Sequence, residues 1–281
     1  MGDVFEILKA IFLGIVEGIT EWLPISSTGH MILVDELLRL NASDEFKELF
    51  FVVIQLGAIL AVPIIFWDKL NPFSKNKSDI EKGKVISLWC KVIVGVLPAA
   101  IIGVLLDDWF DKHFYNYLVV SIALIIYGIA FIFVEKSPIK KEKKYTVTSV
   151  YDLTYKDAIK IGLFQILSLV PGTSRSGSTI LGGISIGVSR GASAEFSFFM
   201  AIPVMLGASL LKVVKFIGEG IVMTSLEAWI LIIGIVVSFL VSIVAIKFLM
   251  EFVKRHSFYV FGIYRIALGV IVIIYFLINK L

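Results

Sequence analysis

The sequence has little charge and almost no cysteine, and each shortage excludes a class of protein. Charged residues make up 17% of the 281 residues, and hydrophobic residues make up 58%. A soluble domain has about 25% charged and about 45–50% apolar residues, so this composition predicts a polytopic membrane protein. The one cysteine, Cys90, excludes an intrachain disulfide and a zinc site built on several thiolates. We expect Cys90 to be a small core residue.

The chain also lacks a strong excess of positive charge. Its net charge is +3, and its lysines cluster in loops between apolar runs. Such clusters are typical of loops that set membrane orientation, so no nucleic-acid partner is expected. The N-terminus lacks the positively charged start and the cleavage site of a signal peptide. We therefore expect its first apolar stretch to be retained.

Long apolar runs, by contrast, are abundant. A transmembrane helix needs about 20 apolar residues, and six runs reach that length. They lie at about 46–66, 85–106, 115–134, 195–217, 226–249 and 258–278. Two further regions, 5–40 and 158–189, are broken in the middle by proline, glycine, serine and charged residues. We expect these to be re-entrant helical hairpins, because irregular backbone at membrane depth must be buried in protein or line a wet cavity.

The order of elements predicts an all-α integral membrane domain, 1–281, made of two inverted-topology repeats. A broken hairpin followed by three spans occurs at about 1–134 and again at 158–281. Because three is odd, the second copy enters the membrane upside down relative to the first. In membrane proteins of this architecture the functional site lies near the bilayer midplane, so the two hairpin tips are expected to face each other.

Loop charge gives the orientation. The loop 67–84 and the linker 135–157 are rich in lysine, whereas the segment 107–114 between them is acidic. The positive-inside rule places the two lysine-rich segments in the cytoplasm and the acidic segment outside. The C-terminus then also lies outside.

An acidic pair occurs in the first hairpin. Glu17 and Glu21 are four residues apart, so on a helix both carboxylates share one face. Two like charges so close disfavour full ionisation, which a shared proton or a divalent cation would relieve. Oxygen ligands suit Mg²⁺ or Ca²⁺, and the pair is a predicted metal site. The alternative is two carboxylates that face water at a helix end.

A hydroxyl cluster follows the acidic pair. Pro24 ends the first helix, and Ser26, Ser27 and Thr28 suit the N-cap of a second short helix. His30 lies about one turn after Ser27, and a serine–histidine hydrogen bond is a common way to activate a weak nucleophile. The alternative is capping alone, with His30 as a satisfied core histidine.

The tip of the second hairpin, 172–177, resembles an anion site. It combines flexible backbone, hydroxyl groups and one guanidinium, and it leads into a segment that can start a helix. Helix N-termini and glycine-rich turns present N–H groups to phosphate, and Arg175 adds a bidentate donor. The predicted phosphate-binding residues of this tip are Gly172, Ser174, Arg175 and Ser176. The alternative is a breaker that kinks a helix, which does not explain Arg175.

The free-energy cost of burying unpaired charged groups predicts that the two hairpin tips contact each other. Glu17, Glu21, His30 and Arg175 at membrane depth would together cost about 10 kcal/mol if left unpaired, at roughly 2.5–3.5 kcal/mol each. An acidic pair, a hydroxyl nucleophile, a histidine and an arginine form an inventory for phosphoryl transfer. The apolar surroundings point to a lipid-linked phosphate as substrate.

At these residues the chain resembles the undecaprenyl-diphosphate phosphatase family, also called the bacitracin-resistance protein family. Its (E/Q)xxxE motif corresponds to Glu17–Glu21, its PxSSTGH stretch to Pro24–His30, and its PGxSRSxxT motif to Pro171–Thr179. The resemblance extends over essentially the whole chain. It implies hydrolysis of undecaprenyl diphosphate to undecaprenyl phosphate and phosphate, which recycles the cell-wall lipid carrier. It also implies a cytoplasmic-membrane protein, an active site on the outer face, and Mg²⁺ or Ca²⁺.

The resemblance also implies residue roles. Glu17 and Glu21 would bind metal or diphosphate, Ser27 would be the nucleophile and His30 its base. Ser26 is adjacent to Ser27, and direct attack by water with His30 or Glu21 as base also stays open. The implied phosphate-binding residues are Ser174, Arg175 and Thr179. From their place at the first tip, Ser26 and Thr28 are also predicted to bind phosphate.

Two alternatives compete with an enzyme. Inverted repeats around a midplane site are also the architecture of transporters, so a transporter or flippase for a phosphate-bearing lipid is the second hypothesis. A structural subunit leaves the buried charges unexplained. The GxxxG spacings Gly14/Gly18 and Gly183/Gly187 predict packing within the chain or between the subunits of a homodimer. Arg265, near the end of a span, is expected to snorkel to the membrane surface.

Overall fold

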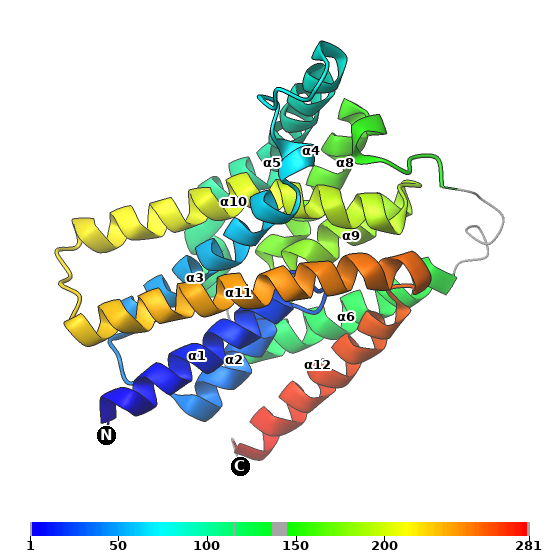
Figure 1. Cartoon of the computed structure of the whole chain (residues 1–281). Coiled ribbons are helices and arrows are strands. Elements are labelled where there is room, and N and C mark those ends of the chain that lie inside the picture. The colour runs from blue at the N-terminus through cyan, green and yellow to red at the C-terminus, as the bar shows by residue number, and fades with distance from the viewer. Residues whose placement is uncertain (1, 115, 137–144, 280–281) are drawn as a thin grey trace.

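The computed structural model describes residues 2–114, 116–136 and 145–279, and Figure 1 shows their arrangement as a bundle of helices. Among these residues the sole β-type pairing is an isolated bridge between Val147 and Val188. The elements are α1 (Gly2–Thr20), α2 (Ser27–Leu38), α3 (Asp44–Ile65), α4 (Trp67–Leu70), α5 (Asp79–Phe114), α6 (Tyr117–Lys136), η1 (Val150–Asp152), α8 (Tyr155–Ile166), η2 (Leu167–Leu169), α9 (Arg175–Ser185), α10 (Arg190–Gly218), α11 (Ser225–Arg255) and α12 (Tyr259–Asn279).

The prediction of a polytopic helical membrane protein is confirmed. In the described part of the chain, six helices are long and apolar enough to cross a membrane. They are Asp44–Ile65, Asp79–Leu106, Tyr117–Lys136, Arg190–Gly218, Ser225–Arg255 and Tyr259–Ile278. The predicted loop at 107–114 is instead a continuation of α5. Part of the predicted linker, 137–144, lies outside the described residues.

The two broken regions form the pairs α1–α2 and α8–α9, each with a short turn between its helices. Helix α1 packs along α11, and α8 packs along α5, the helix at the matching place in the other predicted repeat. Figure 1 shows α11 (orange) running beside α1 (blue), and α12 (red) beside α6. Two equivalent repeats would pack in this way, with the first hairpin helix of each against the second membrane span of the other. The re-entrant depth of the hairpins, their inverted insertion and the repeat boundaries stay predictions.

Glycine permits the closest approaches between helices. A Cβ on Gly128 would lie 2.7 Å from the carbonyl oxygen of Gly262, and a Cβ on Gly262 would lie 2.7 Å from that of Gly128. Helices α6 and α12 therefore cross backbone to backbone, as small residues permit in membranes. Gly14 and Gly18 approach the α11 backbone in the same way, so this GxxxG spacing packs within the chain.

Replacing Gly262 with alanine is expected to destabilise the fold by about 1–3 kcal/mol, the usual cost of overpacking. Gly207 is the matched control, because nothing lies within 4 Å of a Cβ added there. The control Gly207→Ala should be neutral or stabilise by up to about 1 kcal/mol, since alanine favours helix. Thermal unfolding in detergent compares the two, and equal midpoints would contradict the close crossing.

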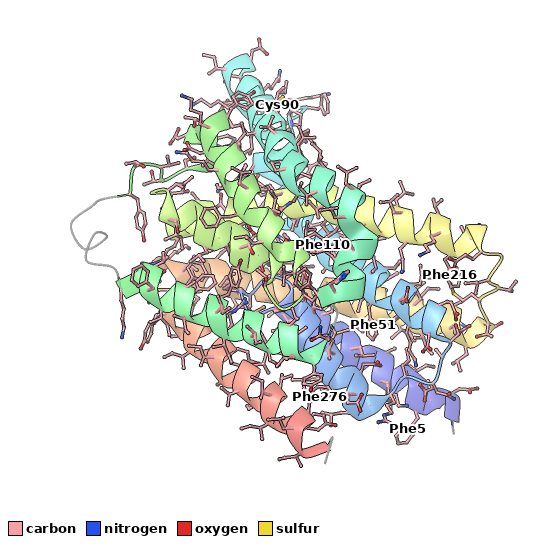
Figure 2. The ribbon with its side chains drawn as sticks, turned by 180° about the vertical axis from the view of Figure 1, so that it is seen from behind. Phe5, Phe51, Cys90, Phe110, Phe216 and Phe276 are labelled. Carbon is pink, nitrogen blue, oxygen red and sulfur yellow. The ribbon has the colours of Figure 1, made fainter. Side chains whose placement is uncertain are left out.

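The expectation that Cys90 lies in the core is wrong. The thiol is exposed on α5, and Figure 2 labels it at the outer surface of the bundle. A membrane-spanning helix is apolar on its outward face as well as its inward face, so an apolar sequence around a residue does not predict burial.

Candidate functional site

The two hairpin tips end in the same backbone turn. Ser26 and Ser174 both have φ of 73°, and each caps the helix that follows. The Ser26 hydroxyl accepts a hydrogen bond from the Gly29 amide at 3.2 Å, and the Ser174 hydroxyl accepts one from Gly177 at 3.0 Å. Left-handed backbone at a non-glycine residue stores strain and is concentrated at functional sites. The turns aim the N-termini of α2 and α9, which favour anions.

A single carboxylate joins the two tips. The Ser27 hydroxyl donates to Oε2 of Glu21 at 2.8 Å, and Nη2 of Arg175 donates to Oε1 at 2.8 Å. The side chains of Arg175 and Glu21 are 10% and 6% exposed, so the ion pair is nearly removed from solvent. Nη1 of Arg175 is held at 2.8 Å by the carbonyl oxygen of Ser197 on α10. The structure thus brings together the predicted nucleophile, the acidic group and the arginine.

Other predicted phosphate-binding hydroxyls lie in the same place but are engaged by protein atoms. The Ser176 hydroxyl donates to the carbonyl oxygen of Glu21 at 3.0 Å, which adds a second link between the tips. The Thr179 hydroxyl is 2.7 Å from that of Ser197 and 2.9 Å from the carbonyl oxygen of Arg175. Phosphate binding by these hydroxyls stays a prediction. Of the predicted site residues, those that are partly exposed are Ser27, Thr28, His30, Ser174 and Arg175.

His30 does not hydrogen-bond to Ser27, contrary to the sequence prediction. Its Nδ1 lies 2.7 Å from the carbonyl oxygen of Ser26, and its Nε2 lies 2.7 Å from the Tyr264 hydroxyl. A carbonyl can only accept, so Nδ1 carries the hydrogen and Nε2 of the neutral ring accepts from Tyr264. The two rings are also stacked, with centroids 5.6 Å apart. Spacing along α2 alone could not reveal a competing partner from α12.

Glu17 supplies a buried oxygen without a partner. The residue is 1% exposed, and its Oε1 has no hydrogen-bond partner among the described residues. Nowhere in the described ranges do three or more His, Cys, Asp or Glu side chains form a group that could hold a metal ion. The unpartnered Glu17 oxygen is the carboxylate atom that this site could offer to a cation such as Mg²⁺, because both oxygens of Glu21 already accept from Ser27 and Arg175. Proteins can hold Mg²⁺ through one or two carboxylates while substrate phosphates complete its coordination.

The expectation that Arg265 snorkels to the surface is wrong. Its side chain is completely buried, with 0% exposure. The guanidinium donates to the carbonyl oxygens of Pro24 at 3.1 Å, Gly172 at 2.9 Å and Thr173 at 2.8 Å. Both tips are therefore bound by one side chain that sequence analysis left out of the site. An arginine inside an apolar run was the available signal, because intramembrane charges are usually functional.

Comparison with known proteins identifies the family of this chain. The family model described as "Bacitracin resistance protein BacA" matches residues 10–271. The "Undecaprenyl-diphosphatase" of Enterococcus faecalis is 57% identical over 97% of this chain and 98% of its own. The relative from Acetivibrio thermocellus is 57% identical over 98% of this chain and 99% of its own. The relative from Streptococcus mutans is 54% identical over 99% of this chain and 98% of its own. The chain belongs to the bacitracin resistance protein BacA family.

Proposed function

We infer that this protein is a membrane hydrolase that converts undecaprenyl diphosphate to undecaprenyl phosphate and inorganic phosphate. The observation that carries the inference is the shared carboxylate of Glu21, which holds Ser27 from one tip and Arg175 from the other. Full-length relatives named for this activity support it. Their names do not favour the transporter alternative. Recycling of the cell-wall lipid carrier and resistance to bacitracin follow from the activity and the family.

In the proposed reaction Ser27 attacks the terminal phosphorus and Glu21 takes the hydroxyl proton. The Ser27 hydroxyl already donates to Glu21, which is the geometry that general-base catalysis needs. The bond from phosphorus to the bridging oxygen breaks, and undecaprenyl phosphate leaves. Water then attacks the phosphoserine, the bond from phosphorus to the serine oxygen breaks, and Glu21 returns its proton to that oxygen. Both protons of the water stay with the released phosphate.

Arg175 and the two helix N-termini would bind the diphosphate. The guanidinium is fixed by Glu21 and Ser197, so its donors are oriented before substrate arrives. Fixed donors of this kind stabilise developing charge without reorganisation. The partly exposed Thr28 and Ser174 line the same face, and Ser26, Gly172, Ser176 and Thr179 support it.

The proposed cation is Mg²⁺ or Ca²⁺, bound through Glu17 with help from Glu21 and completed by diphosphate oxygens. It would neutralise phosphate charge. We also propose the cytoplasmic membrane as the location, with the site open to its outer face, because the lysine-rich segments predict a cytoplasmic side. A homodimer is a further proposal, to be tested by cross-linking in membranes.

The function is tested by phosphate release from undecaprenyl diphosphate by the full chain in detergent. Wild type should release phosphate, and Ser27→Ala should reduce the rate by about 10²-fold or more, as loss of an activated nucleophile does. A parallel vesicle assay follows lipid translocation. Folded wild type that moves the lipid but releases no phosphate would reject the hydrolase.

Removal of divalent cations is expected to lower the rate about tenfold or more, since metal charge contributes several kcal/mol to stabilising phosphoryl transition states. Mg²⁺ or Ca²⁺ should restore it. Glu17→Gln should raise the cation concentration needed for half-maximal rate. Glu36→Gln is the control, because Glu36 pairs with Arg39 on the surface of α2. An unchanged cation requirement in Glu17→Gln would contradict this site.

A further inference from the structure

Arg265 is a buried cation with no direct link to Glu21. Among the described residues it forms no ion pair, although its side chain is completely buried. Burial of a charge is costly unless hydrogen bonds and counter-charges compensate. Here the compensation comes from carbonyl oxygens and from the Tyr127 ring, whose centroid lies 5.6 Å from the guanidinium carbon. Because burial of this charge is costly in free energy, we asked which contacts the buried guanidinium makes possible.

The hydrogen bonds of Arg265 divide between the tips. Nη1 donates to the carbonyl oxygen of Pro24 in the first tip at 3.1 Å. Nη2 donates to those of Gly172 and Thr173 in the second tip, at 2.9 and 2.8 Å. These carbonyl groups stand one or two residues before the capping serines whose φ is 73°. One planar fork therefore spans the two turns that begin α2 and α9.

The guanidinium also lies close to the start of both helices. A Cβ added to Gly177, in the first turn of α9, would be 3.0 Å from Nη1. On the other side, Nη1 bonds to Pro24, three residues before α2 begins at Ser27. The positive ends of the two helix dipoles and a cation without a carboxylate partner are thus gathered in one place, which favours binding of an anion.

We propose that Arg265 is a positioning residue, which fixes the spacing of the two tips so that Ser27 and Arg175 reach the same carboxylate. Its charge adds to the field that attracts the diphosphate. The catalytic consequence rests on the proposed phosphatase function, whereas the effect on the tips does not. Lysine would keep the charge but lose the bridge, because a single ammonium replaces a fork with donors on both sides.

Steady-state phosphate release separates these two contributions. Arg265→Lys is expected to lower kcat about 10–100-fold with KM within about threefold, because misplacement of reacting groups by about 1 Å can cost 10²-fold. Arg265→Gln should lower kcat similarly and raise KM, since the charge is also lost. Lys91→Gln is the matched control. Lys91 is a cation with 8% exposure that donates to the Tyr151 carbonyl oxygen in η1 rather than to a tip.

Hydrogen exchange of the full chain in detergent gives a readout that does not depend on activity. Arg265→Gln should speed exchange in segments 24–30 and 172–178 together, with α3 and α10 unchanged, and Lys91→Gln should change neither tip. Wild-type kcat in Arg265→Lys, unchanged exchange at both tips, or faster exchange throughout the bundle would overturn the proposal. If wild type releases no phosphate but the tips respond as expected, the proposed function fails and the positioning role stands.

Discussion

Glu21→Gln is expected to lower kcat by about 10³-fold, within the 10²–10⁴-fold range of general-base catalysis. Glutamine keeps the shape of the side chain and can still accept from Ser27 through its one oxygen. It cannot take a proton from that hydroxyl, and it removes the charge that Arg175 pairs with. The measurement is phosphate release under saturating substrate.

The matched control for Glu21→Gln is Glu36→Gln, the same change one helix away. Glu36 pairs with the exposed Arg39, so this control should stay within about twofold of wild type. If Glu21→Gln keeps more than a tenth of the wild-type kcat while folded, the proton is transferred by another group. His30 would then be the next candidate.

Arg175→Lys is expected to lower kcat/KM by about 10²–10³-fold, the loss typical when one fixed donor to developing charge is removed. The guanidinium reaches Glu21 with Nη2 and Ser197 with Nη1, and lysine cannot satisfy both while facing a phosphate. The measurement is kcat/KM for undecaprenyl diphosphate, with folding checked by thermal unfolding.

Arg190→Lys is the control for this change. Arg190 also forks onto a carboxylate, with Nε and Nη2 at 3.0 and 2.6 Å from the two oxygens of Glu135, but it lies away from the tips. Its replacement should affect stability more than kcat/KM. Equal losses of kcat/KM in Arg175→Lys and Arg190→Lys would mean that the first loss reports folding rather than phosphate binding.

Much of the fold follows from composition and run length. The six membrane-spanning segments begin and end within six residues of the predicted runs, because a bilayer demands a minimum apolar length, although α5 itself continues to Phe114. The breaks at Pro24 and Gly172 were predictable for a different reason, because proline and glycine interrupt a helix. Composition and run length did not predict which side chains of a membrane-spanning helix lie on the outer surface of the bundle, as the exposed Cys90 shows.

The structure brings three of the predicted site residues together, but it pairs them in a way that was not predicted. Motifs identified Glu21, Ser27 and Arg175, whereas spacing suggested His30 as the partner of Ser27. The structure assigns that hydroxyl to Glu21 instead, and assigns His30 to Tyr264. These contacts join residues from 6 to 234 positions apart, and a single sequence does not encode which helix faces are brought together.

Arg265 shows the limit most clearly. Its position near the end of an apolar run predicted snorkelling to the membrane surface, but the side chain is buried because other segments supply acceptors for it. Three carbonyl oxygens, freed where the two tips leave helical geometry, accept from Nη1 and Nη2, whereas the buried Nε has no hydrogen-bond partner among the described residues. The sequence of α12 alone does not predict these acceptors, because they lie in distant segments of the chain.

The most direct test of a site shared by both tips is a comparison of Ser27→Ala, Arg175→Ala and the double variant in single-turnover phosphate release. The two side chains belong to different hairpins and meet on Glu21. Residues that act as a unit show strongly non-additive losses, so the double variant should be within about threefold of the slower single variant. A double variant whose loss equals the product of the two single losses would mean that the tips act independently, and would contradict the account.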